Sequence, residues 1–195
     1  SGSSNKNNLG FLVIALPIAT IVWGLMLDPI DGLLNAIIGV FGIPPQPFLI
    51  SEHQALWCII GIATWKGVAF WMLFLLAGLE DIPKHYYEAA SIDGAKTFDK
   101  FRFVTLPLLR RTILFVFVAD TAANFVLMVP MIILTKGGPL QSTNVLVYEA
   151  YRSGFFYQDW GRSLSIVTIL TTITLIVIGL HLLFLGDSRE GQKVK

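Results

Sequence analysis

The stretch LSIVTILTTITLIVIGLHLLFL, residues 164–185, contains no Asp, Glu, Lys or Arg. A helix needs about 20 mostly apolar residues, each rising about 1.5 Å, to cross the hydrocarbon core of a bilayer. Three more apolar runs of comparable length occupy residues 9–27, 54–79 and 112–134. The sequence therefore predicts an all-α, polytopic membrane protein with four transmembrane helices.

The composition of the chain favours the same class. Hydrophobic residues make up 54% of the 195 residues and charged residues only 14%, whereas a soluble domain usually carries roughly a quarter charged residues. The formal net charge of +1 gives no field that would attract nucleic acid, and no Cys/His cluster has metal-ligand spacing. We therefore expect neither a metal site nor a nucleic-acid partner.

Basic residues are distributed unequally between the loops that join the apolar runs. Residues 28–53 contain no Lys or Arg, whereas residues 80–111 are rich in both. The positive-inside rule then places the 80–111 loop and both termini in the cytoplasm, with residues 1–8 as a linker or N-terminal tail and 187–195 as a cytoplasmic tail. The basic residues of the 80–111 loop are Lys84, Lys96, Lys100, Arg102, Arg110 and Arg111. Three cations would lie on the outer side of the membrane, contrary to the positive-inside rule: Lys136, Arg152 and Arg162.

The 80–111 loop is long enough to hold two short helices. Pro83 suits the first turn of one helix, and Gly94 permits the sharp reversal that ends it. A second helix is predicted to begin near Thr97, and Pro107 is predicted to break it before the next span.

The segments predicted to lie outside also carry helix signals. Residues 32–41 form a short apolar run, which we expect to lie along the outer membrane interface. In the second outer segment, Thr143 is a candidate N-cap for an aromatic helix that runs through Tyr148 and Tyr151 and ends at Gly154.

The sequence EAASIDGAKTFDKFRFVTLPLL, residues 88–109, resembles the EAA loop of binding-protein-dependent ATP-binding-cassette (ABC) importer permeases. The match combines Glu88-Ala89-Ala90, Gly94 four residues after the second alanine, and Leu106-Pro107 at the family's distance. Val104 departs from the pattern, since isoleucine is common at that position.

Further segments are similar to the carbohydrate-uptake branch of that family, which includes the maltose and glycerol-3-phosphate transporters. The resemblance covers nearly the whole chain from about Leu9 and implies a helical bundle of the type I ABC importer permease kind. That family usually has at least two more spans upstream. The similar segments are Gly32-Leu33-Leu34-Asn35, Trp65-Lys66-Gly67, Ala77-Gly78-Leu79 with Ile82-Pro83, Leu134-Thr135 with Gly137-Gly138-Pro139, and Tyr151-Arg152.

The resemblance implies a permease subunit of an importer in a bacterial or archaeal cytoplasmic membrane, for a sugar or related polar solute. Its partners would be a second homologous permease, two ATP-binding subunits and an extracytoplasmic solute-binding protein. The two alanines would let a partner backbone approach closely, and the carboxylate would accept charge-assisted hydrogen bonds from it. The residues that would couple to the ATPase are Glu88, Ala89, Ala90, Asp93, Gly94, Leu106 and Pro107.

The chain contains no GxxxxGK[ST] phosphate loop. We therefore do not expect it to be an enzyme by itself, and no catalytic residue or cofactor is assigned to it. ATP and Mg would be bound by the partner subunits.

The resemblance also places the translocation pathway around Trp65-Lys66-Gly67 and along the following inner helix. An aromatic ring beside hydroxyl and amide groups suits a sugar, although aromatic residues in a membrane helix more often pack against neighbours or lipid. Asn124 would equally serve as an interhelical hydrogen-bonding residue. The pathway candidates are Trp65, Lys66, Gly67, Phe70, Thr121 and Asn124.

Two charges fall inside predicted spans, where each costs roughly 2.5 to 3.5 kcal/mol on insertion scales. Lys66 either pairs with an acid such as Asp120, lines the solute path, or contacts helix-end carbonyls, and we place pairing first. Two alternative functions follow: an ion-coupled secondary transporter that uses Lys66 and Asp120, or a non-transporting scaffold subunit. The secondary transporter offers no reason for the long, doubly helical 80–111 loop, and a lack of solute-dependent ATPase activity in the whole complex would favour the scaffold.

Overall fold

The computed structural model describes residues 15–186, and this part of the chain is helical with no strand. It divides into two compact units, which are described separately: residues up to 67 with 125–171, and 68–124 with those from 172 onward. The all-α fold is therefore confirmed over the described residues. The tails predicted for residues 1–8 and 187–195 lie outside them.

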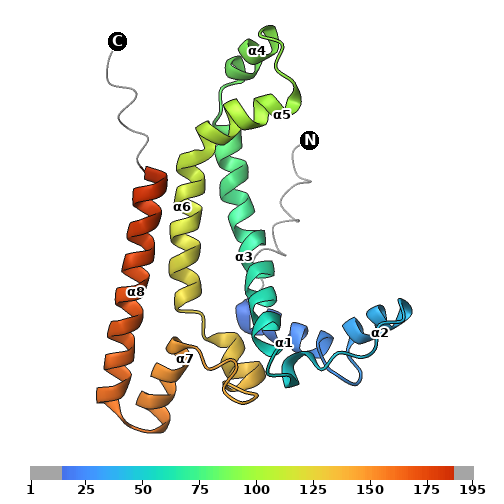
Figure 1. Ribbon diagram of the computed structural model, residues 1–195, viewed down its shortest axis with the longest axis vertical. Coiled ribbons are helices and arrows are strands. Elements are labelled where there is room, and N and C mark those ends of the chain that lie inside the picture. The colour runs from blue at the N-terminus through green and yellow to red at the C-terminus, as the bar shows by residue number, and fades with distance from the viewer. Residues whose placement is uncertain (1–14, 187–195) are drawn as a thin grey trace, which may run out of the picture. The chain divides into compact units, whose positions relative to one another are not determined.

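The helices follow one another along the chain as Figure 1 shows. They are α1 (Leu16–Met26), α2 (Leu33–Val40), α3 (Ala55–Glu80), α4 (Lys84–Ile92), α5 (Thr97–Lys100), α6 (Leu106–Phe125), α7 (Leu146–Tyr151) and α8 (Trp160–Gly186), with a 3₁₀ turn at Phe48–Ile50. Three π-helical segments join them, at Phe101–Thr105, Met131–Thr135 and Arg152–Phe156.

Within the described residues, α3 and α8 are long and apolar enough to cross a membrane. Leu164 and Leu175 of α8 are both 64% exposed, as expected for a helix whose surface faces lipid. α1 is apolar but has only 11 residues, and the part of the predicted 9–27 span that precedes residue 15 is not described. α6 has 20 residues.

The continuous helix predicted over residues 112–134 is wrong. α6 ends at Phe125, and a new helical turn begins at residue 129, with Pro130 in it, and leads into the π-helical segment 131–135. A proline is tolerated in the first turn of a helix, but it has no N–H to donate to the carbonyl four residues earlier, so a regular helix does not continue through it from α6. Hydropathy averaged over residues 112–134 does not reveal the effect of a single proline on the helix.

The predicted break at Pro107 is also wrong, because α5, the π-helical segment 101–105 and α6 follow one another without interruption. The Leu106 N–H donates to the carbonyl of Phe101, five residues earlier, which makes the turn before Pro107 wider than an α-helical turn. A wide turn accommodates the proline ring, which would clash with a carbonyl in a regular helix.

In the first unit, the core forms around Ile59, Met131 and Tyr148, which are between 1% and 5% exposed. The buried Asn35 links the loops on both sides of α2 by hydrogen bonds. Its Nδ2 donates to the carbonyls of Pro29 at 3.0 Å and Gln46 at 2.9 Å. Its Oδ1 accepts the Gln46 N–H at 2.8 Å.

In the second unit, α3 and α6 approach each other closely near the loop that joins them. A Cβ added at Gly78 would lie 2.7 Å from Thr112 Oγ1, so only glycine fits this contact without a shift. Phe74 packs on Phe115 with ring centroids 5.6 Å apart. These contacts support the segment that carries α4 and α5.

Candidate functional site

The first candidate site is α4, a nine-residue helix in the 80–111 loop. Pro83 precedes it in an extended conformation, and Gly94 follows it with φ +80°. The Gly94 N–H donates to Ser91 O at 3.1 Å and the Ala95 N–H to Ala90 O at 2.9 Å, which together form a Schellman motif. The reversal predicted at Gly94 is thereby confirmed.

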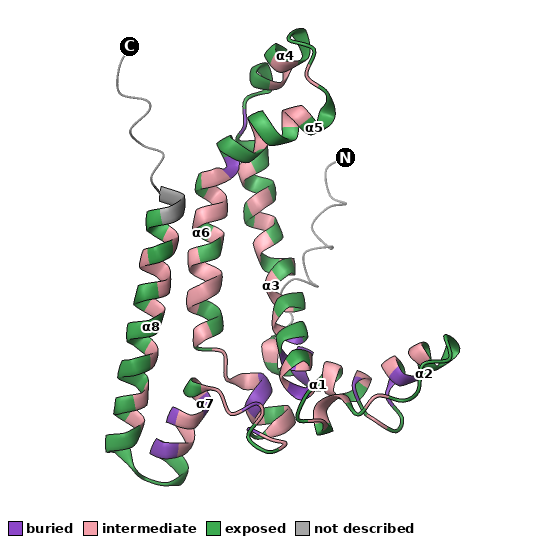
Figure 2. Cartoon of the chain, in the orientation of Figure 1, coloured by how far each residue is buried: buried purple, intermediate pink, exposed green. Residues whose placement is uncertain are grey.

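The residues expected to couple to an ATPase lie on this helix, in the turn at 93–94 that follows it, and at the start of α6. Glu88 and Ala89 are exposed and Ala90 is half-buried, and Ile92 beside them is 87% exposed. Most of α4 is exposed in Figure 2. Asp93, Leu106 and Pro107 are exposed as well. Part of α4 is therefore a small surface, partly apolar and partly acidic, that no described residue covers.

Four side chains, which we call the α4 clamp, hold α4 against the segment that leads into α6. The Tyr87 hydroxyl lies 3.0 Å from Thr105 Oγ1, and Lys100 Nζ donates to Ser91 Oγ at 2.7 Å. Ser91 Oγ in turn donates to the carbonyl of Tyr87 at 2.6 Å. No sequence motif pointed to these contacts, although the i, i+4 spacing of Tyr87 and Ser91 places both on one helix face.

Removal of the clamp is expected to loosen α4. In a Lys100→Met/Thr105→Val double variant, the two hydrogen bonds of the clamp to α4, worth about 0.5–1.5 kcal/mol each, are lost. The longer hydrogen bond from the Thr105 hydroxyl to the carbonyl of Lys100, at 3.4 Å, is lost as well. We therefore expect the α4 amides to exchange hydrogen roughly tenfold faster, as measured by mass spectrometry on the peptide that contains α4. A Lys84→Met/Thr97→Val variant removes the same groups outside the clamp and serves as control. Equal exchange in both variants would contradict the role of the clamp.

The pathway candidates of the first unit are Trp65, Lys66 and Gly67 on α3. The Trp65 ring packs edge-on against Trp23 with centroids 5.7 Å apart, yet 45% of the residue is exposed. Lys66 and Gly67 are half-buried. Trp65 thus makes the packing contact expected of an aromatic residue in a membrane helix, and its role toward a solute stays a prediction.

The pathway candidates of the second unit are Phe70 on α3 and Thr121 and Asn124 on α6. Phe70 packs against Trp71 with centroids 4.8 Å apart. Asn124 Nδ2 donates to the carbonyl of Asp120 at 2.9 Å within its own helix, and Thr121 is half-buried. The Asp120 carboxylate accepts the indole N–H of Trp71 at 2.5 Å. The pairing of Lys66 with Asp120 stays a prediction.

A second polar site lies in the first unit, around α7. Thr143 is not the N-cap predicted for this helix, which begins at Leu146. Its buried hydroxyl instead donates to Gly138 O at 2.8 Å and bonds Thr135 Oγ1 at 2.7 Å, which fixes the preceding turn. Gly154 does not end the helix either, because it is buried inside the π-helical segment 152–156.

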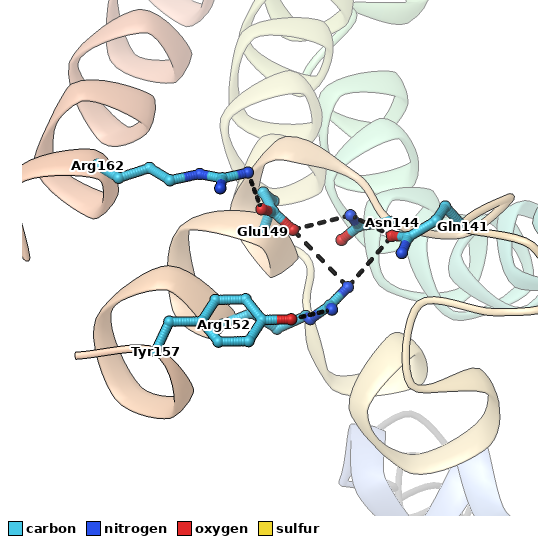
Figure 3. Close-up of a pocket in the computed structure, with 6 residues that line it drawn as sticks. All are labelled: Gln141, Asn144, Glu149, Arg152, Tyr157 and Arg162. Carbon is cyan, nitrogen blue, oxygen red and sulfur yellow. Dashed lines mark hydrogen bonds and ion pairs between the residues drawn. The ribbon is translucent and has the colours of Figure 1, made fainter. Parts of the chain in front are cut away.

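We call the polar cluster beside α7 the Glu149 network (Figure 3). Glu149 Oε1 accepts a hydrogen bond from Arg162 Nη2 at 2.6 Å. Glu149 Oε2 accepts one from Asn144 Nδ2 at 2.8 Å. Arg152 Nη1 lies farther from Oε2, at 3.8 Å. The network lines a hollow and comprises Gln141, Asn144, Glu149, Arg152, Tyr157 and Arg162.

Within this network, Arg152 is held mainly by neutral groups. Its Nη1 donates to Gln141 Oε1 at 3.2 Å and its Nη2 donates to the Tyr157 hydroxyl. The hydrogen bond to Tyr157, more than the nearby Glu149 charge, raises the pKa of Arg152 above its ordinary value. The guanidinium therefore remains a fixed positive charge at this position.

Comparison with known proteins places the chain in a family. The family model described as "Binding-protein-dependent transport system inner membrane component" matches residues 8–189. The chain is 35% identical over 172 residues to the sn-glycerol-3-phosphate transport system permease protein UgpA of Agrobacterium fabrum, covering 88% of this chain and 58% of that protein. It is 33% identical over 159 residues to the trehalose/maltose transport system permease protein MalF of Thermococcus litoralis, covering 80% and 53%.

A solved structure of a bacterial ABC transporter involved in the import of the acidic polysaccharide alginate shares the fold. The TM-score is 0.76 at 19% sequence identity, over 91% of this chain and 63% of that one. The chain spans 58% of the length of UgpA and 53% of that of MalF. On the family match and these identities, the chain belongs to the binding-protein-dependent transport system inner membrane components.

Proposed function

We propose that this chain is a membrane-spanning permease subunit of an ABC importer and forms part of the pathway for a sugar or related polar solute. It works with a second homologous permease, two ATP-binding subunits that hold ATP and Mg, and an extracytoplasmic solute-binding protein. Family membership and the names of the relatives support this assignment. The 80–111 loop and both termini face the cytoplasm in this proposal.

The exposed surface of α4 is the observation that carries the proposal. The exposed Glu88 carboxylate and the exposed apolar Ile92 lie on one short helix, and its end is fixed by the Schellman motif at Gly94. Such a surface suits a partner protein, because it offers a hydrogen-bond acceptor beside apolar area that gains from burial. In this proposal, α4 docks in a groove of the ATP-binding subunit.

The position of α4 explains how ATP hydrolysis could act on the membrane helices. Three residues, 81–83, separate it from α3, and the α4 clamp ties it to the segment that continues into α6. A displacement of α4 by closing ATP-binding subunits is therefore passed to both helices. In this proposal the solute contacts residues along α3 and α6, namely Trp65, Lys66, Gly67, Phe70, Thr121 and Asn124.

Charge reversal at Glu88 tests this proposal. In Glu88→Lys, charge-assisted hydrogen bonds worth about 1.5–3 kcal/mol are lost and replaced by repulsion, so co-purification of the ATP-binding subunits is expected to fall at least tenfold. Glu52→Lys, which reverses an exposed carboxylate in the first unit, is the matched control.

The measurement is the amount of ATP-binding subunit recovered with the permease, together with ATP hydrolysis stimulated by the solute-binding protein. If Glu88→Lys retains both at the level of Glu52→Lys, α4 is not the docking surface. If wild type recovers no ATP-binding subunit at all, the importer function itself is wrong.

A further inference from the structure

Beside the Glu149 network lies a second hollow, which we call the tyrosine pocket. Its volume of about 350 Å³ falls within the range of small-molecule binding sites. It lies entirely in the first unit, where α7 and two π-helical segments meet. The lining residues are Ile132, Lys136, Tyr148, Tyr151, Arg152, Phe156 and Tyr157.

Several polar groups that line this pocket are not used by the protein. Tyr148 is only 5% exposed, yet within residues 15–183 no hydrogen bond engages its hydroxyl. The same holds, in that part of the chain, for the Tyr151 hydroxyl and the Lys136 ammonium group. None of these three groups is a polar atom sealed in the core, and Lys136 is exposed, so all three can hydrogen-bond a ligand that enters the pocket.

The pocket is also positively charged. The single carboxylate of Glu149 lies between two cations, Arg162 at 2.6 Å and Arg152 at 3.8 Å, so it neutralises only one of the two positive charges. Lys136 reaches the pocket from a left-handed backbone position, φ +50°, at the end of the segment 131–135. Two cations, Lys136 and Arg152, therefore face the hollow, and none of its described lining residues is acidic.

Aromatic rings form much of the remaining wall. Tyr151 packs against Phe156 with centroids 5.7 Å apart and against Tyr148 at 6.3 Å. A sugar ring has apolar faces that suit aromatic side chains and hydroxyl edges that need hydrogen bonds. The two cations add recognition of an acidic group, since Arg and Lys are the usual partners of carboxylate and phosphate.

We propose that the tyrosine pocket binds a monosaccharide unit that carries a carboxylate or a phosphate. Lys136 and Arg152 contact the acidic group, and the Tyr148 and Tyr151 hydroxyls contact hydroxyl groups of the sugar. This inference rests on the proposed import function and names its solute class as acidic carbohydrate. It also gives a reason for cations on a segment that the positive-inside rule predicts to lie outside. A concave site of monosaccharide size favours a small ligand over the acidic side chain of a partner protein.

The test is ligand binding to the purified, complete transporter in detergent, without its solute-binding protein, by isothermal titration calorimetry. The probes are glucuronate, glucose 6-phosphate and glucose. We expect at least one anionic probe to bind ten or more times more tightly than glucose. Lys136→Gln is expected to remove this preference, and Tyr148→Phe to weaken binding of the anionic probe several-fold. Lys136→Arg keeps the charge and is expected to retain the preference.

A control variant and three contrary outcomes make the test decisive. Lys96→Gln removes an exposed ammonium group outside the pocket, α4 and the α4 clamp, and it is expected to leave sugar binding unchanged. Equal affinity for glucose and both anionic probes, or full anionic binding by Lys136→Gln, would overturn the inference. If no probe binds but Lys136→Gln weakens association with the solute-binding protein, the pocket receives an acidic protein side chain and the inference is wrong. ATP hydrolysis stimulated by the solute-binding protein is measured separately, so failure of the import function is recognised independently.

Discussion

The substitution Gly94→Val is expected to abolish solute uptake. Gly94 has φ +80°, and an added Cβ meets no atom within 4 Å, so any effect of a substitution comes from the backbone rather than from a clash. A β-branched residue resists a left-handed conformation, which costs about 1–2 kcal/mol even for an ordinary residue. The Schellman motif would open, and α4 would no longer present Glu88 in one orientation.

A series of substitutions at position 94 separates the effect of the left-handed backbone from the effect of adding a side chain. Asparagine tolerates the left-handed region, so Gly94→Asn is expected to retain much of the uptake, with Gly94→Ala between Asn and Val. Gly39→Val, at a helical glycine where an added Cβ also meets nothing, is the control for valine itself. The measurement is uptake of labelled solute into proteoliposomes. Uptake that does not follow the order Asn, Ala, Val would show that the left-handed turn is not required.

Removal of the Glu149 carboxylate is expected to destabilise the first unit by about 2 kcal/mol. In Glu149→Ala the Arg152 guanidinium, whose side chain is 20% exposed, loses its anionic neighbour, and Asn144 Nδ2 loses an acceptor. Arg162 contributes less, because its side chain is 58% exposed and water replaces the lost contact.

Glu149→Gln is the matched variant, because an amide oxygen still accepts one hydrogen bond while the charge is lost. We expect it to lower the thermal unfolding midpoint by less than Glu149→Ala, which should lower it by several degrees. Purified protein in detergent, followed by the fluorescence of a thiol-reactive dye at the half-buried Cys58, provides the measurement. An unchanged midpoint in Glu149→Ala would mean that the network adds nothing to stability.

Much of the architecture could be predicted because it depends on local chemistry. Apolar runs of sufficient length predicted the helices now seen as α3 and α8, and glycine at position 94 predicted the left-handed reversal that ends α4. The two prolines show where local reasoning fails. Pro130 lies in an apolar run yet follows the end of α6, whereas Pro107 is accommodated by a wide turn that depends on the backbone before it.

The side-chain contacts of both candidate sites could not be predicted, because they join residues distant in sequence. Tyr87 on α4 contacts Thr105 in the π-helical segment across the turn between α4 and α5. Glu149 contacts Arg162 across the connection from α7 to α8. Sequence spacing does not reveal either pair until the turn is folded. The family resemblance identified residues on α4 that would contact a partner, but not those that hold the helix in place.

The continuous helical stretch from α5 into α6 has a mechanical consequence, because its direction changes where the π-helical segment meets α6 (Figure 1). π-helical turns and prolines are the usual sites of such bends. Beyond the bend, the 20 residues of α6, at about 1.5 Å each, form a rod roughly 30 Å long. A small tilt imposed on α6 at this bend would therefore move its far end sideways by several ångströms.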